Sequence, residues 1–316
     1  MLKYISIPLS SGSDSFCHYN STRSNEESFI SEETLEKVVF WAMRENLSIQ
    51  FVYPRAAVPR KLEPVIESID HIKIVPEAAC DKALLDKADI IIAENFNIPT
   101  KIPGKIYVVR TDLAGLLASA HVLKKLMDFS KKVNVVFTDT ESFSKEDIDS
   151  YREFLNGMAD HIASEYIGGN GPQLNLITDR LLLTEMNNCN AGDETIAVSP
   201  EGEFYPCPAF IGEPLFACGN IDEGLRIPNQ SLYKRENAPI CKVCDAYHCK
   251  RCAWLNHRLT HETNTPGWQQ CYMSHIERSA SARALEAINA ANPEILKDAG
   301  IPHIDYLDPF TIVERL

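Results

Sequence analysis

The sequence lacks the features that mark several common classes of protein. No apolar run approaches the roughly 18 residues of a membrane-spanning helix, and the first residues lack the apolar core and cleavage site of a signal peptide. The net charge is −13, which argues against nucleic-acid binding, because that binding depends on positive side chains that neutralise phosphates. No P-loop, G-x-G-x-x-G, G-x-S-x-G or H-E-x-x-H motif occurs, which excludes the common nucleotide-binding, hydrolase and zinc-protease sites. We therefore expect a cytoplasmic protein without membrane or nucleic-acid partners.

Cysteine is abundant and is concentrated in one part of the chain. Eight of the ten cysteines lie within residues 189–271, and the densest part reads CKVCDAYHCKRC, a C-x2-C-x4-C-x2-C run. In a reducing compartment such thiols serve as metal ligands rather than as disulfides. Thiolates that converge from two tight turns suit a tetrahedral zinc ion or an iron–sulfur cluster. The stretch therefore predicts a metal-binding region.

Before about residue 185, apolar segments rich in Val and Ile alternate with amphipathic segments. The expected strands are KYISIP, IQFVYP, HIKIVP, DIIIA, KIYVV, KVNVVFT and QLNLIT. The expected helices are SEETLEKVVFWAMREN, residues 61–69, CDKALLDKA, residues 113–129 and a helix that begins after Ser144. This alternation predicts an α/β fold in which helices cover a parallel sheet. A partial (β/α) barrel and an open doubly wound sheet both fit the pattern.

After about residue 185 the helical periodicity stops, and Gly, Pro, Asn and Cys dominate until about residue 272. The segments ETIAV and EFYPC flank a turn at residues 199–202 and predict a hairpin. SHIERSASARALEAINA predicts a closing helix, and the tail PHIDYLDPFTIVERL is apolar enough to pack on the body. We expect a barrel-like part over residues 1–185, a small cysteine-rich domain over 186–273, and a C-terminal helix and tail over 274–316.

The order of the cysteines resembles the SPASM domain of radical S-adenosylmethionine (SAM) enzymes. The matching text is a C-x12-G-x4-C segment with Gly202 at its centre, the C-x2-C-x4-C-x2-C run and a final Cys271. Within that run, the family more often has longer spacings. The resemblance implies a partial barrel and two interleaved auxiliary iron–sulfur clusters, of the [4Fe–4S] type. It assigns one cluster to Cys241, Cys244, Cys249 and Cys271, and the other to Cys189, Cys207 and Cys252.

The fourth ligand of the second cluster is not assigned by this resemblance. Cys218 is a candidate only because it follows Cys207 closely in the sequence. An alternative interpretation of the whole cysteine set is one or two zinc ions that serve only to stabilise the fold.

A radical SAM enzyme carries C-x3-C-x2-C after its first strand, where three thiolates hold the cluster that cleaves SAM. This chain has Cys17, Ser21 and Ser24 at those positions. A serine hydroxyl is a poor iron ligand because it stays protonated near neutral pH. The glycine-rich segment that the family carries after its second strand is also missing, since this chain reads FVYPR at residues 51–55. We interpret the loop as a degenerate SAM-cluster motif, and the alternative is an ordinary serine-rich loop with one buried cysteine.

The opening segment LKYISIPLSSGSDSFCHYN and the cysteine-rich part together are similar to the CXXX repeat peptide maturase family. That similarity implies a role in maturing a ribosomally made precursor peptide. The protein would bind the peptide, or pair with an active radical SAM enzyme, and use its clusters for electron transfer without cleaving SAM itself. The alternative function is a zinc-stabilised, non-catalytic binding protein or scaffold.

Overall fold

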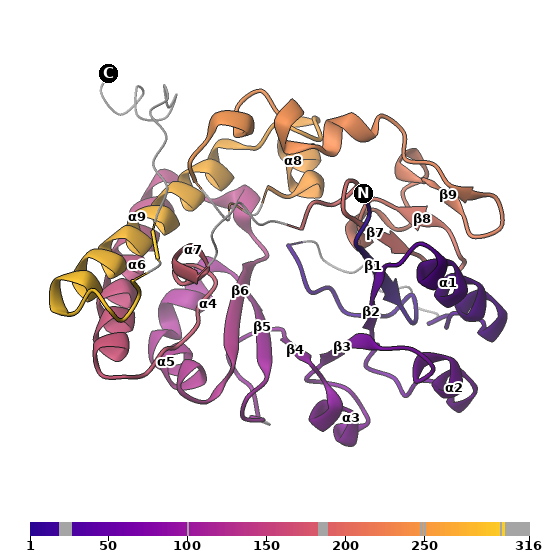
Figure 1. The fold of residues 1–316 in the computed structure, drawn as a ribbon, viewed down its shortest axis with the longest axis horizontal. Coiled ribbons are helices and arrows are strands. Elements are labelled where there is room, and N and C mark those ends of the chain that lie inside the picture. The colour runs from indigo at the N-terminus through magenta and orange to yellow at the C-terminus, as the bar shows by residue number, and fades with distance from the viewer. Residues whose placement is uncertain are drawn as a thin grey trace.

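The computed structural model describes residues 1–18, 27–99, 101–182, 189–246, 249, 251–297 and 299–300. Its main feature is a curved sheet with the strand order β6-β5-β4-β3-β2-β1-β7-β8 (Figure 1). Strands β1 to β7 pair in parallel, and β8 pairs antiparallel with β7. The first six strands are β1 (Tyr4–Pro8), β2 (Ser48–Val52), β3 (His71–Pro76), β4 (Ile90–Ala93), β5 (Ile106–Thr111) and β6 (Lys132–Phe137). The predicted α/β fold with a partial (β/α) barrel is confirmed.

Four of the helices that follow these strands begin at a capping side chain, namely α1 (Glu32–Arg44), α3 (Lys82–Lys87), α4 (Leu113–Ala118) and α6 (Lys145–Ile167). The Ser31 hydroxyl accepts a hydrogen bond from the Thr34 amide at 3.0 Å, and Ser144 and Asp147 form a reciprocal capping box. Both helices are among those that the sequence predicts. The other helices of the barrel part are α2 (Glu63–Ile66), α5 (Ala120–Phe129) and α7 (Asp179–Leu182).

The expectation of a strand over QLNLIT is wrong, because only Leu174 pairs with β6, in a single parallel bridge to Val133. The side chain of Asn175 replaces the missing strand pairing: it accepts from the Val135 amide at 2.9 Å and donates to the Val135 carbonyl at 3.0 Å. The Thr178 hydroxyl accepts from the Leu174 amide at 2.9 Å. These side-chain bonds turn the chain into α7 rather than along the sheet.

The predicted hairpin after residue 186 is confirmed, as β7 (Thr195–Val198) and β8 (Phe204–Tyr205). Gly202 in its turn has φ +88°, and a Cβ there would lie 3.0 Å from Ile221 and 3.2 Å from Thr34 of α1. Because β7 pairs with β1, the hairpin extends the barrel sheet. The domain boundaries at residues 185 and 273 stay predictions.

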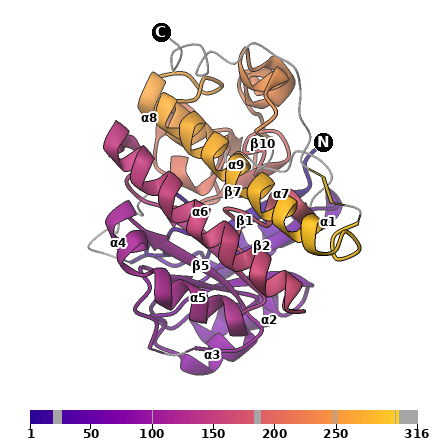
Figure 2. The same cartoon turned by 90° about the vertical axis from the view of Figure 1, so that its left-hand side faces the viewer.

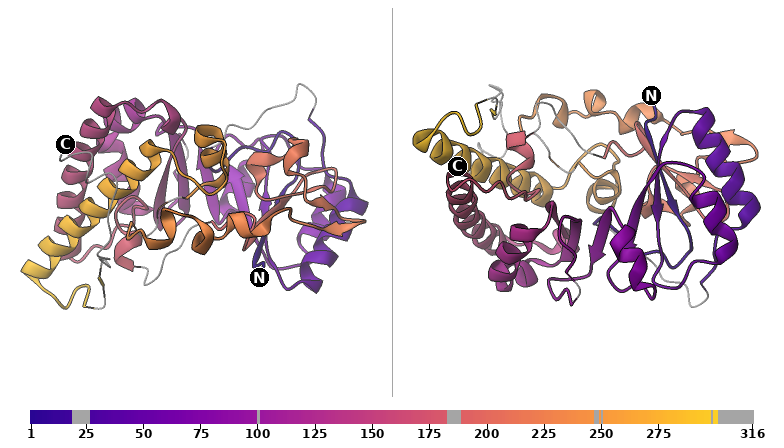
Figure 3. Two further views of the ribbon diagram at one scale, coloured as in Figure 1. Left: turned by 90° about the horizontal axis from the view of Figure 1, so that it is seen from above. Right: turned by 60° about the horizontal axis from the view of Figure 1, so that its bottom comes forward.

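A short antiparallel pair follows, formed by β9 (Gly219–Asn220) and β10 (Gly224–Leu225). The chain then runs through 3₁₀ turns to α8 (Ala253–Thr260) and α9 (Trp268–Ala291). In Figures 1 and 3 the cysteine-rich segment, drawn in orange, reaches from the β7–β8 edge of the sheet to α9. Helix α9 was predicted to begin near residue 274 and in fact includes Cys271. The predicted tail PHIDYLDPFTIVERL lies outside the described residues. Among the described helices, none has the length and apolar character that a membrane span requires.

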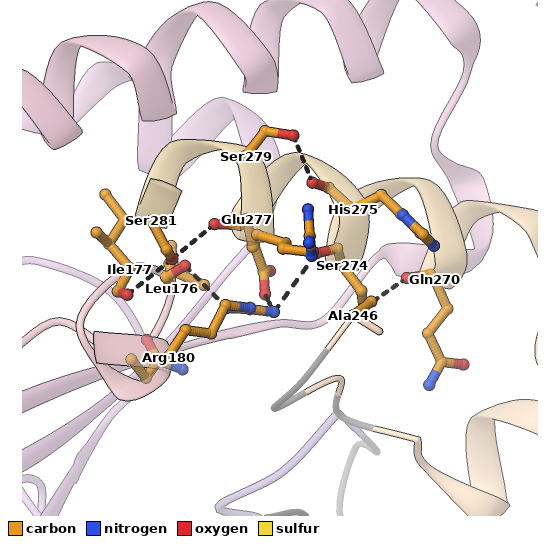
Figure 4. Close-up of polar contacts among 12 residues, drawn as sticks. Leu176, Ile177, Arg180, Ala246, Gln270, Ser274, His275, Glu277, Ser279 and Ser281 are labelled. Carbon is orange, nitrogen blue, oxygen red and sulfur yellow. Dashed lines mark hydrogen bonds and ion pairs between the residues drawn. The ribbon is translucent and has the colours of Figure 1, made fainter. Parts of the chain in front are cut away.

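Helices α6 and α9 lie side by side on one face of the molecule (Figure 2). A buried ion pair joins α9 to the barrel: an Arg180 terminal nitrogen lies 3.0 Å from a Glu277 carboxylate oxygen (Figure 4). The Tyr151 hydroxyl of α6 donates to the other Glu277 oxygen at 2.9 Å. Burial, followed by the charge of Glu277, raises the pKa of Tyr151 well above its ordinary value, so this hydroxyl stays protonated and keeps donating.

We expect Glu277→Gln to lower the free energy of unfolding by about 3–5 kcal/mol, because it leaves the buried Arg180 guanidinium without a counterion. Asp160→Asn is the matched control, since Asp160 of α6 pairs with Arg283 of α9 at 2.6 Å on the exposed surface. Its loss should cost about 1 kcal/mol or less. Urea denaturation of both variants measures the difference, and equal losses would contradict the assignment.

Candidate metal centre

Three thiols of the C-x2-C-x4-C-x2-C run form the first thiol group: Cys241, Cys244 and Cys249. Burial, followed by interaction with Cys249, raises the pKa of Cys241 to about 11. Burial also raises the pKa of Cys249, which further interacts with Cys244. The three sulfurs are therefore close enough to interact electrostatically.

One face of α9 packs on the loop that carries the first thiol group. Burial raises the pKa of Cys249 and the nearby Ser274 side chain lowers it. His275 Nε2 lies 3.9 Å from Cys244 Sγ, and Arg278 pairs with Asp245 at 3.0 Å. Figure 4 shows Ser274 and His275, which are consecutive residues of this helix. Cys271 precedes them at helical spacings of three, four and seven residues, so it belongs to the same face. The fold thus brings Cys271 to the side of α9 that faces the first thiol group.

The second thiol group consists of Cys189, Cys207 and Cys252. Burial raises the pKa of Cys207 well above its ordinary value, and the next contributions come from Cys252 and Cys189. Burial, followed by Cys189, raises the pKa of Cys252 to about 12. Cys252 also caps α8, because its sulfur accepts from the Leu255 amide at 3.4 Å. Cys189 is exposed as a residue, yet the pKa of its thiol is raised by burial of the sulfur.

Cys17 connects the second thiol group to the mouth of the barrel, the edge formed by the carboxyl ends of the strands. Interaction with Cys17 adds to the raised pKa of Cys207. The Cys17 carbonyl accepts from Arg110 Nε at 3.2 Å, and the ring of the adjacent His18 hydrogen-bonds the Phe137 carbonyl at 2.9 Å. Ser21 and Ser24, the other positions of the degenerate motif, lie outside the described residues.

Four charged side chains that sequence reasoning missed occupy the mouth of the barrel. Arg55 Nε lies 2.7 Å from an Asp14 oxygen, and Arg55 Nη2 lies 3.3 Å from Glu94. Arg110, only 3% exposed, lies 3.3 Å from the same Glu94 oxygen. These residues follow or end β1, β2, β4 and β5, and ligands of parallel α/β folds bind at this edge. Among the described residues, two cations and two carboxylates therefore pair with one another at that place.

Cys218, the candidate fourth ligand, lies in the main hydrophobic core at 1% exposure. Its thiol donates to the Phe216 carbonyl at 3.4 Å, and burial raises its pKa to about 11. A thiol that already has an acceptor within the core is typical of a structural cysteine.

The donor chemistry of the two thiol groups fits a thiolate-bound metal or cluster. None of the ten cysteines forms a disulfide bond, and the buried Nε of Arg251, beside Cys252, has no hydrogen-bond partner among the described residues. An anionic group would satisfy such an orphaned donor. In the part of the chain that is described, however, no three Cys, His, Asp or Glu side chains are arranged to hold a metal ion. The ligand assignments therefore stay predictions.

A pocket of about 470 Å³ lies between the mouth of the barrel and the cysteine-rich segment. Its lining comes from the loop after β1, the end of β6, the turn after β8 and helix α8. The residues are His18, Phe137, Thr138, Thr140, Glu141, Ala209, Ile211, Gly212, Glu213, Trp254, Leu255 and Arg258. The Arg258 guanidinium lies 5.6 Å from the centre of the Trp254 ring. One cavity thus combines apolar and aromatic walls with a few charged groups, as ligand-binding pockets commonly do.

Neither a family model nor a curated protein matches the sequence. Solved structures do match. One is hexahistidine-tagged anSMEcpe with bound AdoMet, which is 15% identical to this chain with a TM-score of 0.64. The alignment covers 92% of this chain and 99% of that chain. Native anSMEcpe with bound AdoMet and Kp18Cys peptide is 16% identical with a TM-score of 0.63, at the same coverage. anSMEcpe is a SPASM-containing radical SAM anaerobic sulfatase maturase. The likeness shows that this chain has the radical SAM/SPASM type of fold.

Proposed function

We propose that this protein takes part in the maturation of a precursor peptide and holds auxiliary iron–sulfur clusters without cleaving SAM itself. The observation that carries the proposal is the approach of Cys17, in the loop after β1, to the second thiol group, since Cys17 interacts with the Cys207 thiol. In a radical SAM/SPASM fold that loop would hold the SAM-cleaving site, and the cysteine-rich segment would hold the auxiliary clusters. In this chain the loop after β1 supplies one thiol and two serines, Ser21 and Ser24.

Under this proposal one cluster is held by Cys241, Cys244, Cys249 and Cys271, and the other by Cys189, Cys207 and Cys252. The clusters would supply electron transfer or a site for a substrate thiolate. The first thiol group and the adjacent face of α9 support the first set, because four cysteines are the usual ligands of a [4Fe–4S] cluster. The free thiols also support a reducing compartment, and we place the protein in the cytoplasm.

The charged network at the mouth of the barrel supports the loss of SAM cleavage. Arg55 follows β2, where the family carries a glycine-rich segment, and it is held by Asp14 at 2.7 Å. SAM carries both a carboxylate and an ammonium group, so binding would require this self-neutralised network to open. We propose that the network stabilises the loop that carries Cys17 instead.

The pocket beside α8 is the proposed peptide site. It opens between the barrel and the cysteine-rich segment, and its charges, from Glu141, Glu213 and Arg258, can pair with a peptide of mixed charge. In the similar structures anSMEcpe is bound to the Kp18Cys and Cp18Cys peptides. An active radical SAM enzyme, as a separate partner chain, could modify a peptide that is bound in this pocket.

We expect no 5′-deoxyadenosine when the anaerobically reduced protein is incubated with SAM, because one thiolate cannot hold the SAM-cleaving cluster. The double variant Ser21→Cys/Ser24→Cys should take up additional iron and sulfide, since three thiolates then follow β1. The single variant Ser24→Cys, with two thiolates, is the control and should gain none. Formation of 5′-deoxyadenosine by the unchanged protein would refute the proposal.

Cysteine substitutions should show that the protein holds two separate clusters. Cys244→Ser and Cys252→Ser should each remove about half of the bound iron, because each variant breaks only one of the two ligand sets. The remaining cluster should keep its own electron paramagnetic resonance signal. Cys218→Ala is the control, and its iron content should equal that of the unchanged protein. Stoichiometric zinc without sulfide would favour the zinc-stabilised scaffold instead.

A further inference from the structure

Arg251 lies between the two thiol groups in the sequence. Cys249 of the first thiol group precedes it by two residues, and Cys252 of the second follows it directly. The thiols of Cys241 and Cys249 interact with its charge from one group, and that of Cys189 interacts from the other. One cation is therefore near both groups.

The guanidinium of Arg251 is buried with incomplete hydrogen bonding. The residue is 9% exposed, one terminal nitrogen donates to the Tyr233 carbonyl at 3.1 Å, and the buried Nε has no hydrogen-bond partner among the described residues. A buried donor without an acceptor is unfavourable and is rare in native proteins. The surroundings of Arg251 thus leave a donor that an anionic group could satisfy.

Two other largely buried arginines of this chain have a carboxylate counterion, and Arg251 differs from them. Arg180 pairs with Glu277 at 3.0 Å, and Arg278 pairs with Asp245 at 3.0 Å. No carboxylate of a described residue pairs with Arg251, and the neighbouring charge of Arg235 repels it. A buried cation is stable only when an anion compensates it. The thiols become such an anion when they lose their protons to bind metal.

We propose that Arg251 is the counterion shared by the two thiol groups, and that its charge favours the reduced state of the clusters bound there. The inference rests on the proposed function, because it takes both groups to hold clusters. Each reduction adds one electron from a reductant such as dithionite and makes the charge beside Arg251 more negative by one. Arg251 stays protonated throughout, and no proton moves. Arg251 is thus a positioning residue that acts through charge.

The test is a potentiometric titration of the anaerobic protein with dithionite, followed by electron paramagnetic resonance. In Arg251→Gln both midpoint potentials should fall by about 59 mV, a tenfold shift of each one-electron equilibrium towards the oxidised state. Arg251→Lys keeps the charge and should restore both potentials. Arg283→Gln, which removes an exposed arginine of α9, is the control and should leave both unchanged.

Each outcome decides the inference. Unchanged potentials in Arg251→Gln, or a shift of only one of them, would overturn the shared counterion. Loss of iron from Arg251→Gln with retention in Arg251→Lys would support it, because only the lysine variant keeps the positive charge. Loss of iron from both variants would show a structural role and overturn it. Absence of iron and sulfide from the unchanged protein would instead refute the proposed function, which separates the two failures.

Discussion

The buried contact between Arg180 and Glu277 is the interaction on which the arrangement of the candidate site depends. Arg180 lies on α7, the last helix of the barrel part, and Glu277 lies on α9, so the ion pair sets the position of α9 against the barrel. Residues of the same helix contact the loop of the first thiol group. A buried ion pair is geometrically demanding and gives little net stability. Its role here is to place Cys271 and His275 with respect to that loop.

The hairpin of β7 and β8 positions the second thiol group by a different constraint. Because β7 pairs in parallel with β1, the segment that carries Cys189 and Cys207 begins and ends beside the first barrel strand. The loop after β1 carries Cys17, whose sulfur interacts with Cys207. Backbone pairing therefore connects the cysteine-rich segment to the amino end of β1, while α9 connects it to the opposite edge of the sheet. The two thiol groups lie in the region between these connections.

Much of the fold could be predicted from local patterns. Strands β1 to β6 are short apolar runs whose character follows from burial on both faces, and α1 and α6 begin at capping serines that are visible in the sequence. The strand expected over QLNLIT failed because Asn175 and Thr178 bond to the backbone in place of strand pairing. The hydrogen bonds of Asn175 replace strand pairing only because β6 lies close enough to form them. The position of β6 cannot be predicted from the pattern of apolar residues.

The candidate site shows the same division between local and tertiary information. The two ligand sets come from the family resemblance and stay predictions, because Cys252 interacts with Cys189 of its own set and also with Cys249 of the other. The network of Asp14, Arg55, Glu94 and Arg110 could not be foreseen, since the four residues are far apart in the sequence and meet only at the edge of the sheet. The lack of a carboxylate beside Arg251 among the described residues likewise could not be predicted, because it depends on which residues lie near Arg251 in the fold.

The number and kind of metal groups that one chain holds distinguish two iron–sulfur clusters from structural zinc most directly. Native mass spectrometry of the anaerobically purified protein counts them directly, because each bound cluster or ion adds its own mass to the chain. We expect the added mass of two iron–sulfur clusters and no third. A third cluster in the unchanged protein, or the mass of zinc ions in place of iron and sulfide, would contradict the account.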